Sequence, residues 1–137
     1  MTAEELLDCA ETARRASYCP YSGFAVGAAL LAENGQVFLG CNIENAAFSP
    51  TLCAERVAVA KAVSEGVTRF AALAVVGGAK EGAGGFCPPC GVCRQLVREF
   101  AADTLPVYLR GEDGGVREYT LAQLLPVSFL PAALERG

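Results

Sequence analysis

The stretch FAVGAALLAENGQVFLGCNI, residues 24–43, holds two short apolar runs on either side of a turn signal. The runs 24–32 and 36–43 have the length and composition of buried β-strands. The dipeptide Asn34-Gly35 lies between them and favours a two-residue hairpin turn, because both residues tolerate a positive φ. The sequence therefore predicts that the sheet begins with an antiparallel pair of strands.

Helical patterns flank this hairpin and then alternate with further strands. Upstream, residues 3–16 place apolar side chains at helical spacing. Downstream, residues 49–66 predict a helix with Ser49 as N-cap, Pro50 at the first helical position and Gly66 as its stop. The remaining pattern predicts a strand (69–78), a helix (91–101), a strand (105–111) and a short helix (120–126). We therefore expect an α/β fold, a three-layer α/β/α sandwich with helices on both faces of a mixed central sheet.

The size and composition of the chain fit one domain that acts on a small molecule. The 137 residues are enough for a single domain, 1–137, with an ordinary hydrophobic core. Hydrophobic residues make up 53% of the chain and charged residues only 19%, so we expect some apolar surface to be buried between subunits. The net charge of -4 argues against a nucleic-acid surface, which needs clustered Lys and Arg.

The sequence also predicts a cytoplasmic protein that does not enter a membrane. No segment approaches the roughly 18 uninterrupted apolar residues of a membrane span. Residues 1–17 carry charges where a signal peptide needs an apolar stretch. The chain has seven cysteines, and an odd number in a reducing compartment favours metal binding, catalysis or inert burial over a set of disulfides.

Three of these cysteines fall at the predicted starts of two helices. Cys53 would lie in the first turn of the first of them. Pro89 at the first position of the other would put Cys90 and Cys93 on one face of its first turn. Backbone N–H groups and the helix dipole favour there the thiolate that a metal needs. Three thiolates would leave the fourth position of a tetrahedral zinc open, as in catalytic sites.

A carboxylate stands beside this set, because Glu55 follows Cys53 by two residues. The chain has no histidine, which excludes zinc fingers of the Cys/His type. A fourth thiolate from Cys87 would give a closed structural site, although the two prolines after Cys87 force an extended backbone. The same cysteines could also be buried thiols without a metal or a redox dithiol, but neither arrangement accounts for Glu55.

The combination CAE (53–55) followed by PCGVC (89–93) resembles the signature of the zinc-dependent nucleoside deaminases. The likeness extends over nearly the whole chain. FAVGAAL, GCNIENAAFSPTLCAERVAVAKAVSEG, PCGVCRQ and LLPVSF together resemble the small homotetrameric cytidine deaminases. The all-cysteine ligand set and the short chain suit that branch rather than the larger branch with a histidine ligand.

This resemblance implies a reaction and a role for each residue of the metal site. One zinc ion per subunit would be held by Cys53, Cys90 and Cys93, with the fourth position left to the water that attacks C4 of cytosine. Glu55 would act as general acid and base. Arg56 would hydrogen-bond a sulfur of the site and offset its negative charge. The reaction would convert cytidine and 2′-deoxycytidine into uridine and 2′-deoxyuridine plus ammonia, in pyrimidine salvage.

The resemblance also assigns the substrate contacts and the assembly. Phe24 would pack on the pyrimidine ring, Asn42 and Glu44 would bind the ribose, and the backbone around Ala54 and Pro89 would contact the edge of the base. Two further aromatics would reach the active site of a neighbouring subunit in a homotetramer with shared sites. They are Phe48, where the family usually has Tyr, and Phe129 near the C-terminus.

Three other functions compete with this interpretation. The first is a related deaminase of another aminated ring, such as the antibiotic blasticidin S. The second is an editing deaminase of polymeric RNA or DNA, which the acidic chain disfavours. The third is a non-catalytic module stabilised by a closed zinc site. The remaining cysteines show no partner pattern and are expected to be buried or idle: Cys9, Cys19, Cys41 and Cys87.

Overall fold

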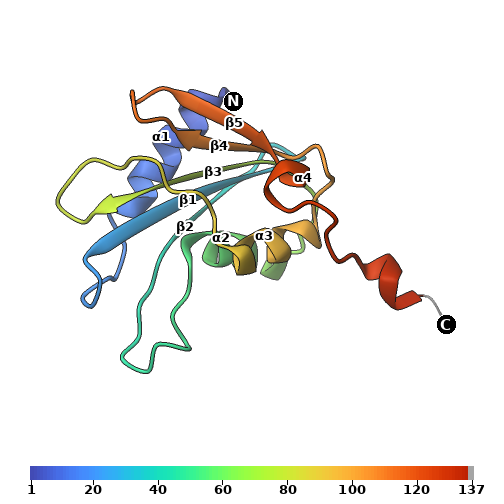
Figure 1. Ribbon diagram of the computed structural model, residues 1–137, viewed down its shortest axis with the longest axis horizontal. Coiled ribbons are helices and arrows are strands. Elements are labelled where there is room, and N and C mark those ends of the chain that lie inside the picture. Colours follow the sequence, from blue (N-terminus) through green and yellow to red (C-terminus); the bar gives the residue numbers. More distant parts are fainter. Residues whose placement is uncertain (136–137) are drawn as a thin grey trace.

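The fold is a single sheet with helices packed on it, seen in a computed structural model that describes residues 1–135 (Figure 1). In chain order the elements of this part are α1 (Ala3–Arg14), β1 (Phe24–Ala32), β2 (Val37–Cys41), α2 (Ala54–Ser64), β3 (Phe70–Ala79), α3 (Gly91–Arg98), β4 (Pro106–Arg110), β5 (Val116–Thr120), α4 (Leu121–Leu124) and the 3-10 helix η1 (Pro131–Glu135). None of the helices in residues 1–135 is long and apolar enough to cross a membrane.

The five strands form one mixed sheet in the order β2-β1-β3-β4-β5. The pairs β1/β2, β1/β3 and β4/β5 are antiparallel, and β3/β4 is parallel. Leu30 of β1 faces Phe38 of β2 on one side and Leu73 of β3 on the other, so β1 is paired along both of its edges. The predicted hairpin and mixed sheet are confirmed. The turn itself differs from the predicted two-residue turn, because the hairpin closes between Ala32 and Gln36, and Gly35 has a positive φ (92°) whereas Asn34 does not.

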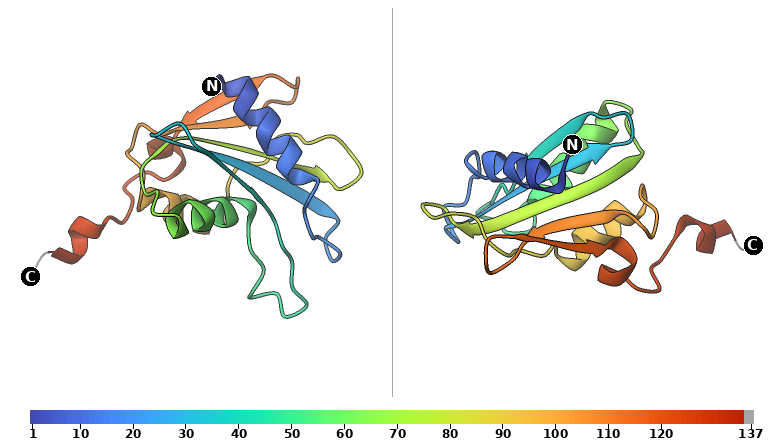
Figure 2. Two further views of the ribbon diagram at one scale, coloured as in Figure 1. Left: turned by 180° about the vertical axis from the view of Figure 1, so that it is seen from behind. Right: turned by 90° about the horizontal axis from the view of Figure 1, so that it is seen from above.

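Helices cover both faces of the sheet, which gives three layers (Figure 2). On one face, Leu6, Leu7 and Ala10 of α1 pack on small strand residues such as Ala29 and Ala74. On the other face, α2 and α3 pack on a larger apolar cluster. Its buried members include Ala58, Val59, Val75, Val97 and Val107. The three-layer prediction is therefore confirmed, and the sheet separates α1 from the two helices that carry the cysteines.

A close approach between α2 and β2 fixes the start of α2. A methyl group added at Gly40 of β2 would lie 2.2 Å from the carbonyl oxygen of Ala54 and 2.7 Å from the nitrogen of Ala58. Only a residue without a side chain allows the first turn of α2 to lie directly on the strand. The position of Cys53, one residue before α2, thus follows from the packing of the helix on the sheet.

Both helix starts differ from the sequence prediction. Helix α2 begins at Ala54 rather than at Pro50, so Ser49 is not its N-cap. The reason is tertiary: Ile43 and Leu52 exchange two backbone hydrogen bonds of 2.9 Å, which hold the preceding segment extended. Helix α3 also begins later than predicted, at Gly91, so that Pro89 lies outside the helix.

The cysteines that were expected inside the first turns, Cys53 and Cys90, are instead the N-cap residues of α2 and α3. Cys93 does lie in the first turn of α3, as predicted. Gly66 follows the end of α2 with a φ of 83°, which confirms it as the stop signal.

The edge strand β5 was not expected from the sequence. Its segment VREYT is short and largely exposed, and it pairs with β4 through a turn at residues 111–115. The last predicted helix is shorter than expected, because α4 covers only Leu121–Leu124. The tail beyond it contains η1 and extends away from the body of the molecule (Figure 1).

Candidate active site

The starts of α2 and α3 bring three thiols together. The sulfur atoms of Cys53 and Cys90 lie 3.7 Å apart, and those of Cys90 and Cys93 lie 3.3 Å apart. All three sulfur atoms lie within 4.8 Å of one another. A tetrahedral zinc with bonds of about 2.3 Å separates its sulfur ligands by roughly 3.8 Å. The donor set and its spacing therefore fit one zinc ion.

The electrostatics of the cluster favour a bound cation. Neither N-cap cysteine uses its side chain to cap its helix, so both sulfurs remain available at the positive ends of two helices. Hydrogen bonds from Cys93 and Cys90, with a smaller contribution from the charge of Arg56, lower the pKa of Cys53 to about 6. Hydrogen bonding to Cys53, together with burial, raises the pKa of Cys93. Metal binding would therefore displace a proton that the cluster keeps on Cys93.

Glu55 lies in the first turn of α2, two residues after Cys53, and its side chain is buried at 3% exposure. It lines a cavity of about 190 Å³ next to the cysteines. Burial raises the pKa of Glu55, and the negative charge of Cys53 adds to this effect. A raised pKa makes this carboxyl group hold a proton more readily than an exposed one, which suits a group that must take up a proton and give it back.

The walls of this cavity come from four parts of the chain. Its lining residues are Val26, Asn42, Thr51, Leu52, Cys53, Ala54, Glu55, Cys87, Pro88 and Cys90. The structure thus brings Asn42 and Ala54 into one cavity with the cysteines. Pro89, the expected proline, is not among the lining residues, and Pro88 takes that place. The carbonyl oxygen of Pro89 instead accepts a hydrogen bond of 2.7 Å from Nε of Arg94.

A second depression, of about 380 Å³, adjoins the first at Thr51. Glu44 lies there, and its carboxylate accepts hydrogen bonds from the backbone N–H groups of Tyr21 (3.0 Å) and Ser22 (3.1 Å) and from the Ser22 hydroxyl. The Ser22 hydroxyl bond is the main cause that lowers the pKa of Glu44. The carboxylate is therefore held in its charged form, in a different depression from Glu55.

Asn42 and Phe24 are linked through the start of β1. The Asn42 amide accepts from the nitrogen of Val26 (2.9 Å) and donates to the carbonyl oxygen of Phe24 (2.8 Å). Phe24 itself is 44% exposed. Its ring and the sulfur of Cys87 both lie over Gly77 of β3, since a methyl group built there would be 3.0 Å from the ring and 2.7 Å from the sulfur.

Cys87 is one of the lining residues that sequence reasoning did not place in the cavity, together with Val26, Thr51, Leu52 and Pro88. It was expected to be idle or, alternatively, to close the metal site as a fourth ligand. It lines the cavity, but it does not belong to the group of three sulfurs. Burial raises the pKa of Cys87 to about 11, which disfavours a thiolate there. The geometry therefore favours the open three-ligand site over the closed one.

Three other residues named from the sequence lie outside the cavity. Arg56 donates to the carbonyl oxygen of Thr51 at 3.4 Å. Phe48 has a φ of 63° and is largely exposed, with an edge contact to the ring of Tyr21. Phe129 is exposed on the tail, where its carbonyl oxygen accepts a hydrogen bond of 3.0 Å from Gln95. Neither aromatic lines the cavity beside the cysteines of its own chain.

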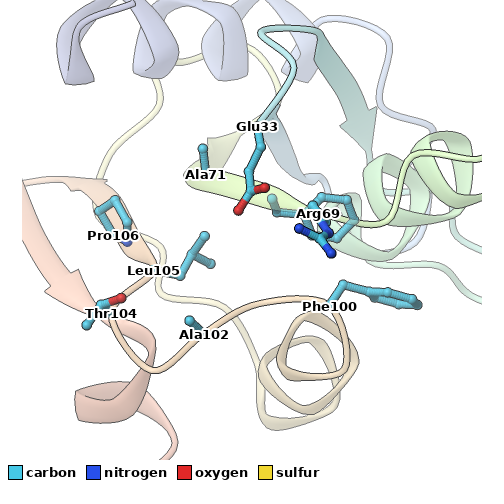
Figure 3. A pocket seen from close by; sticks show the side chains of 9 residues that line it. Glu33, Arg69, Ala71, Phe100, Ala102, Thr104, Leu105 and Pro106 are labelled. Carbon is cyan, nitrogen blue, oxygen red and sulfur yellow. The ribbon is translucent and has the colours of Figure 1, made fainter.

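Another depression, of about 400 Å³, lies where β3 and β4 begin (Figure 3). Its charged side chains are Glu33 and Arg69, and both are exposed. It is lined by no cysteine and by no buried titratable group. We therefore assign the candidate active site to the pocket beside the cysteines.

Comparison with known proteins is consistent with this assignment. Residues 1–109 match the family described as the cytidine and deoxycytidylate deaminase zinc-binding region. The chain is 51% identical to a cytidine deaminase of Sporosarcina psychrophila over 94% of this chain and 92% of that protein. It is 45% identical to a cytidine deaminase of Halalkalibacterium halodurans over 94% and 95% of the two chains.

A solved structure is similar over the same extent. The crystal structure of cytidine deaminase from Burkholderia pseudomallei superposes with a TM-score of 0.84 at 44% identity, and the match covers 94% of this chain and 100% of that one.

Proposed function

The chain belongs to the cytidine and deoxycytidylate deaminase family, and from this premise we propose that it deaminates cytidine and 2′-deoxycytidine in pyrimidine salvage. The reaction consumes one water and gives uridine or 2′-deoxyuridine plus ammonia. The observation that carries the proposal is the cluster of three sulfurs from Cys53, Cys90 and Cys93. Cys53 and Cys90 line the same cavity as the buried Glu55, and Cys93 is buried behind them.

Cys53, Cys90 and Cys93 are the residues that would hold the zinc ion, one per subunit. Zinc bound there supplies Lewis acidity, which makes water a nucleophile near neutral pH. The N-termini of α2 and α3 offset part of the negative charge that three thiolates bring to the site. Arg56 contributes to the same balance, since its charge already lowers the pKa of Cys53.

Glu55 moves the protons of the reaction. Its carboxylate takes a proton from the attacking water and delivers it to N3 of the base. It then takes the second proton, from the hydroxyl group that has become bonded to C4, and delivers it to the amino group, which leaves as ammonia. The raised pKa that burial gives Glu55 suits both halves of this task. Because the side chain is almost completely buried, bulk water does not compete for its proton.

The nucleoside would span the two adjoining depressions. The base would lie beside Glu55, covered by Phe24 and contacted by the backbone at Ala54. The backbone contact expected from Pro89 falls instead to the neighbouring Pro88, which lines the cavity, because the Pro89 carbonyl oxygen is bonded to Arg94. The ribose would lie toward Asn42 and Glu44. The hydrogen bonds that Tyr21 and Ser22 donate support this role for Glu44, because they hold its carboxylate as a fixed acceptor for a hydroxyl group.

We infer a cytoplasmic homotetramer in which each subunit is one domain, 1–137, and the sites are shared. Phe48 and Phe129 would complete the pocket of a neighbouring subunit. Two features support this. Both aromatics are exposed in the single chain, and an apolar depression of about 310 Å³ lies on the outer side of α2 and α3, lined in part by Val59, Val63 and Leu96.

The test is to incubate the purified protein with single substrates and to measure ammonia together with the ultraviolet change of the base. Cytidine and 2′-deoxycytidine should both be turned over. Blasticidin S and a cytosine-containing oligonucleotide, tested singly, should release much less ammonia than either nucleoside. Turnover of blasticidin S with no turnover of cytidine would replace the proposed substrate.

A further inference from the structure

A buried arginine on the far face of the sheet ties together the segments that build the pocket. Arg14, at the end of α1, is only 3% exposed. Its Nη1 atom donates to the carbonyl oxygens of Ala25 (3.1 Å), Gly78 (3.2 Å) and Ala79 (3.4 Å). Its Nη2 atom donates to the carbonyl oxygen of Gly82. One guanidinium thus joins α1 to the start of β1, to the end of β3 and to the loop that follows.

That loop, residues 80–86, leads directly into the cysteines of the second helix start. Glu11 is paired with Arg14 at 3.3 Å and also accepts a hydrogen bond of 3.3 Å from the nitrogen of Gly84. Gly85 and Gly77 then pair through backbone hydrogen bonds of 2.8 and 3.4 Å. The loop is therefore held at Gly82, Gly84 and Gly85, and Gly85 is two residues before Cys87.

A second cation makes the contact in the opposite direction, from the loop to the segment that follows α1. Lys80, in the loop, donates from Nζ to the carbonyl oxygens of Arg15 (3.0 Å) and Ser17 (2.8 Å). Its own nitrogen donates to the carbonyl oxygen of Gly23 at 2.9 Å. These acceptors lie on the connector between α1 and β1, residues 15–23, which carries the N–H groups that hold Glu44.

Packing alone does not account for a charged group at this position. Burying a guanidinium is costly unless every donor finds an acceptor, and an apolar side chain would pack α1 on the sheet as well. What the planar fork of an arginine adds is the ability to bind several carbonyl oxygens in fixed directions. Here those oxygens belong to Ala25, next to the lining residue Val26, and to residues 78–82, which lead through the loop to the lining residue Cys87.

We propose that Arg14 and Lys80 are positioning residues that set the distance between the metal-binding half and the nucleoside-binding half of the site. Arg14 holds the loop that presents Cys90 and Cys93, and Lys80 holds the connector that presents Ser22 to Glu44. The kinetic part of this inference rests on the proposed function, whereas its metal-binding part does not.

Gly84 offers a way to disturb the same contact from the loop side. A methyl group added there would lie 2.1 Å from Oε2 of Glu11 and 3.0 Å from Nε of Arg14. Gly84→Ala should therefore push the ion pair away from the loop without removing either charge. Arg15, the next residue after α1, is exposed, so Arg15→Ala is a matched control.

The experiment compares Arg14→Lys, Gly84→Ala and Arg15→Ala with the wild type in three measurements. These are the rate of zinc release to a chromogenic chelator, kcat and KM for cytidine, and the midpoint of thermal unfolding. Groups that hydrogen-bond directly to metal ligands typically change metal affinity or activity by about 10–100-fold. Arg14 acts through the loop rather than on a ligand, so the lower end of that range applies. We expect about 10-fold faster zinc release and a similar fall in kcat for Arg14→Lys and Gly84→Ala, and wild-type values for Arg15→Ala.

Lys80→Met separates the two halves of the inference. It should raise KM for cytidine several-fold, because the connector beneath Glu44 is loosened, while zinc release stays at the wild-type rate. Lys80→Arg keeps a cation at this position, so its KM for cytidine should stay close to the wild-type value.

The inference would be overturned if Arg14→Lys and Gly84→Ala unfolded at lower temperature but, while folded, released zinc and turned over cytidine at wild-type rates. If Arg14→Lys does not fold, Gly84→Ala decides alone. A wild type that binds zinc without deaminating cytidine would refute the proposed function, and the zinc-release comparison would still judge the role of Arg14.

Discussion

Cys53 and Cys90 occupy the same position in two different helices: each is the N-cap, and their sulfur atoms lie 3.7 Å apart. This shared position matters because an N-cap residue has an extended backbone and projects its side chain past the end of its helix. Two helix N-termini therefore converge on one point from the same face of the sheet, and Cys93 supplies the third sulfur from the first turn of α3.

This arrangement predicts different outcomes for neighbouring cysteines. Cys90→Ser should abolish stoichiometric zinc binding, because two thiolates do not complete the site. Cys87→Ser should retain one zinc per subunit, since Cys87 lies outside the three-sulfur group. Zinc content of the purified variants, measured by elemental analysis, checks this. Equal zinc loss in both variants would indicate a closed four-thiolate site.

Ser22 should control the charge state of Glu44. The Ser22 hydroxyl bond is the main cause that keeps the pKa of Glu44 below its ordinary value of 4.5. A lowered folded-state pKa means that ionised Glu44 stabilises the fold above that ordinary value, and that this contribution is lost as the pH falls below it.

In Ser22→Ala the pKa of Glu44 should rise toward the ordinary value, which an NMR titration of the carboxyl group can follow. The same variant should raise KM for cytidine at neutral pH with little change in kcat, because the carboxylate is less well fixed. An unchanged titration curve would show that the backbone N–H groups of Tyr21 and Ser22 are enough to keep the pKa of Glu44 low, without the Ser22 hydroxyl group.

Much of the fold can be predicted from local patterns, because the hairpin 24–43 and the alternation of apolar runs report directly on burial. The exact helix starts cannot be predicted in this way. The pairing of Ile43 with Leu52 is a tertiary contact that overrides the helix-start signals Ser49 and Pro50. Strand β5 escaped prediction since an exposed edge strand has little apolar pattern.

In the site, too, some residues can be predicted from local sequence patterns and others depend on tertiary contacts. Spacing and residue type identify Cys53, Glu55, Cys90 and Cys93, because a chain with no histidine offers few other ligand sets. Spacing gives no sign that Cys87 lines the cavity or that Arg14 is buried. A single arginine in an amphipathic helix normally faces water, and only the carbonyl oxygens gathered around it explain its burial.

Val127 carries backbone strain that should be removable. It has a φ of 50° and is fully exposed, a conformation that costs a β-branched residue roughly 1–2 kcal/mol. Asn adopts this conformation more readily, so Val127→Asn should stabilise the protein by about 1 kcal/mol in chemical denaturation. A loss of stability would instead indicate that the Val127 side chain is buried against another subunit.

The most direct test of the active-site assignment is the Glu55→Gln variant, assayed for zinc content and for ammonia release from cytidine. Gln keeps the size of the side chain but can neither accept nor return the proton, so zinc should stay at one per subunit while turnover falls by about 100-fold or more. A Glu55→Gln protein that binds zinc and deaminates cytidine at the wild-type rate would contradict the account.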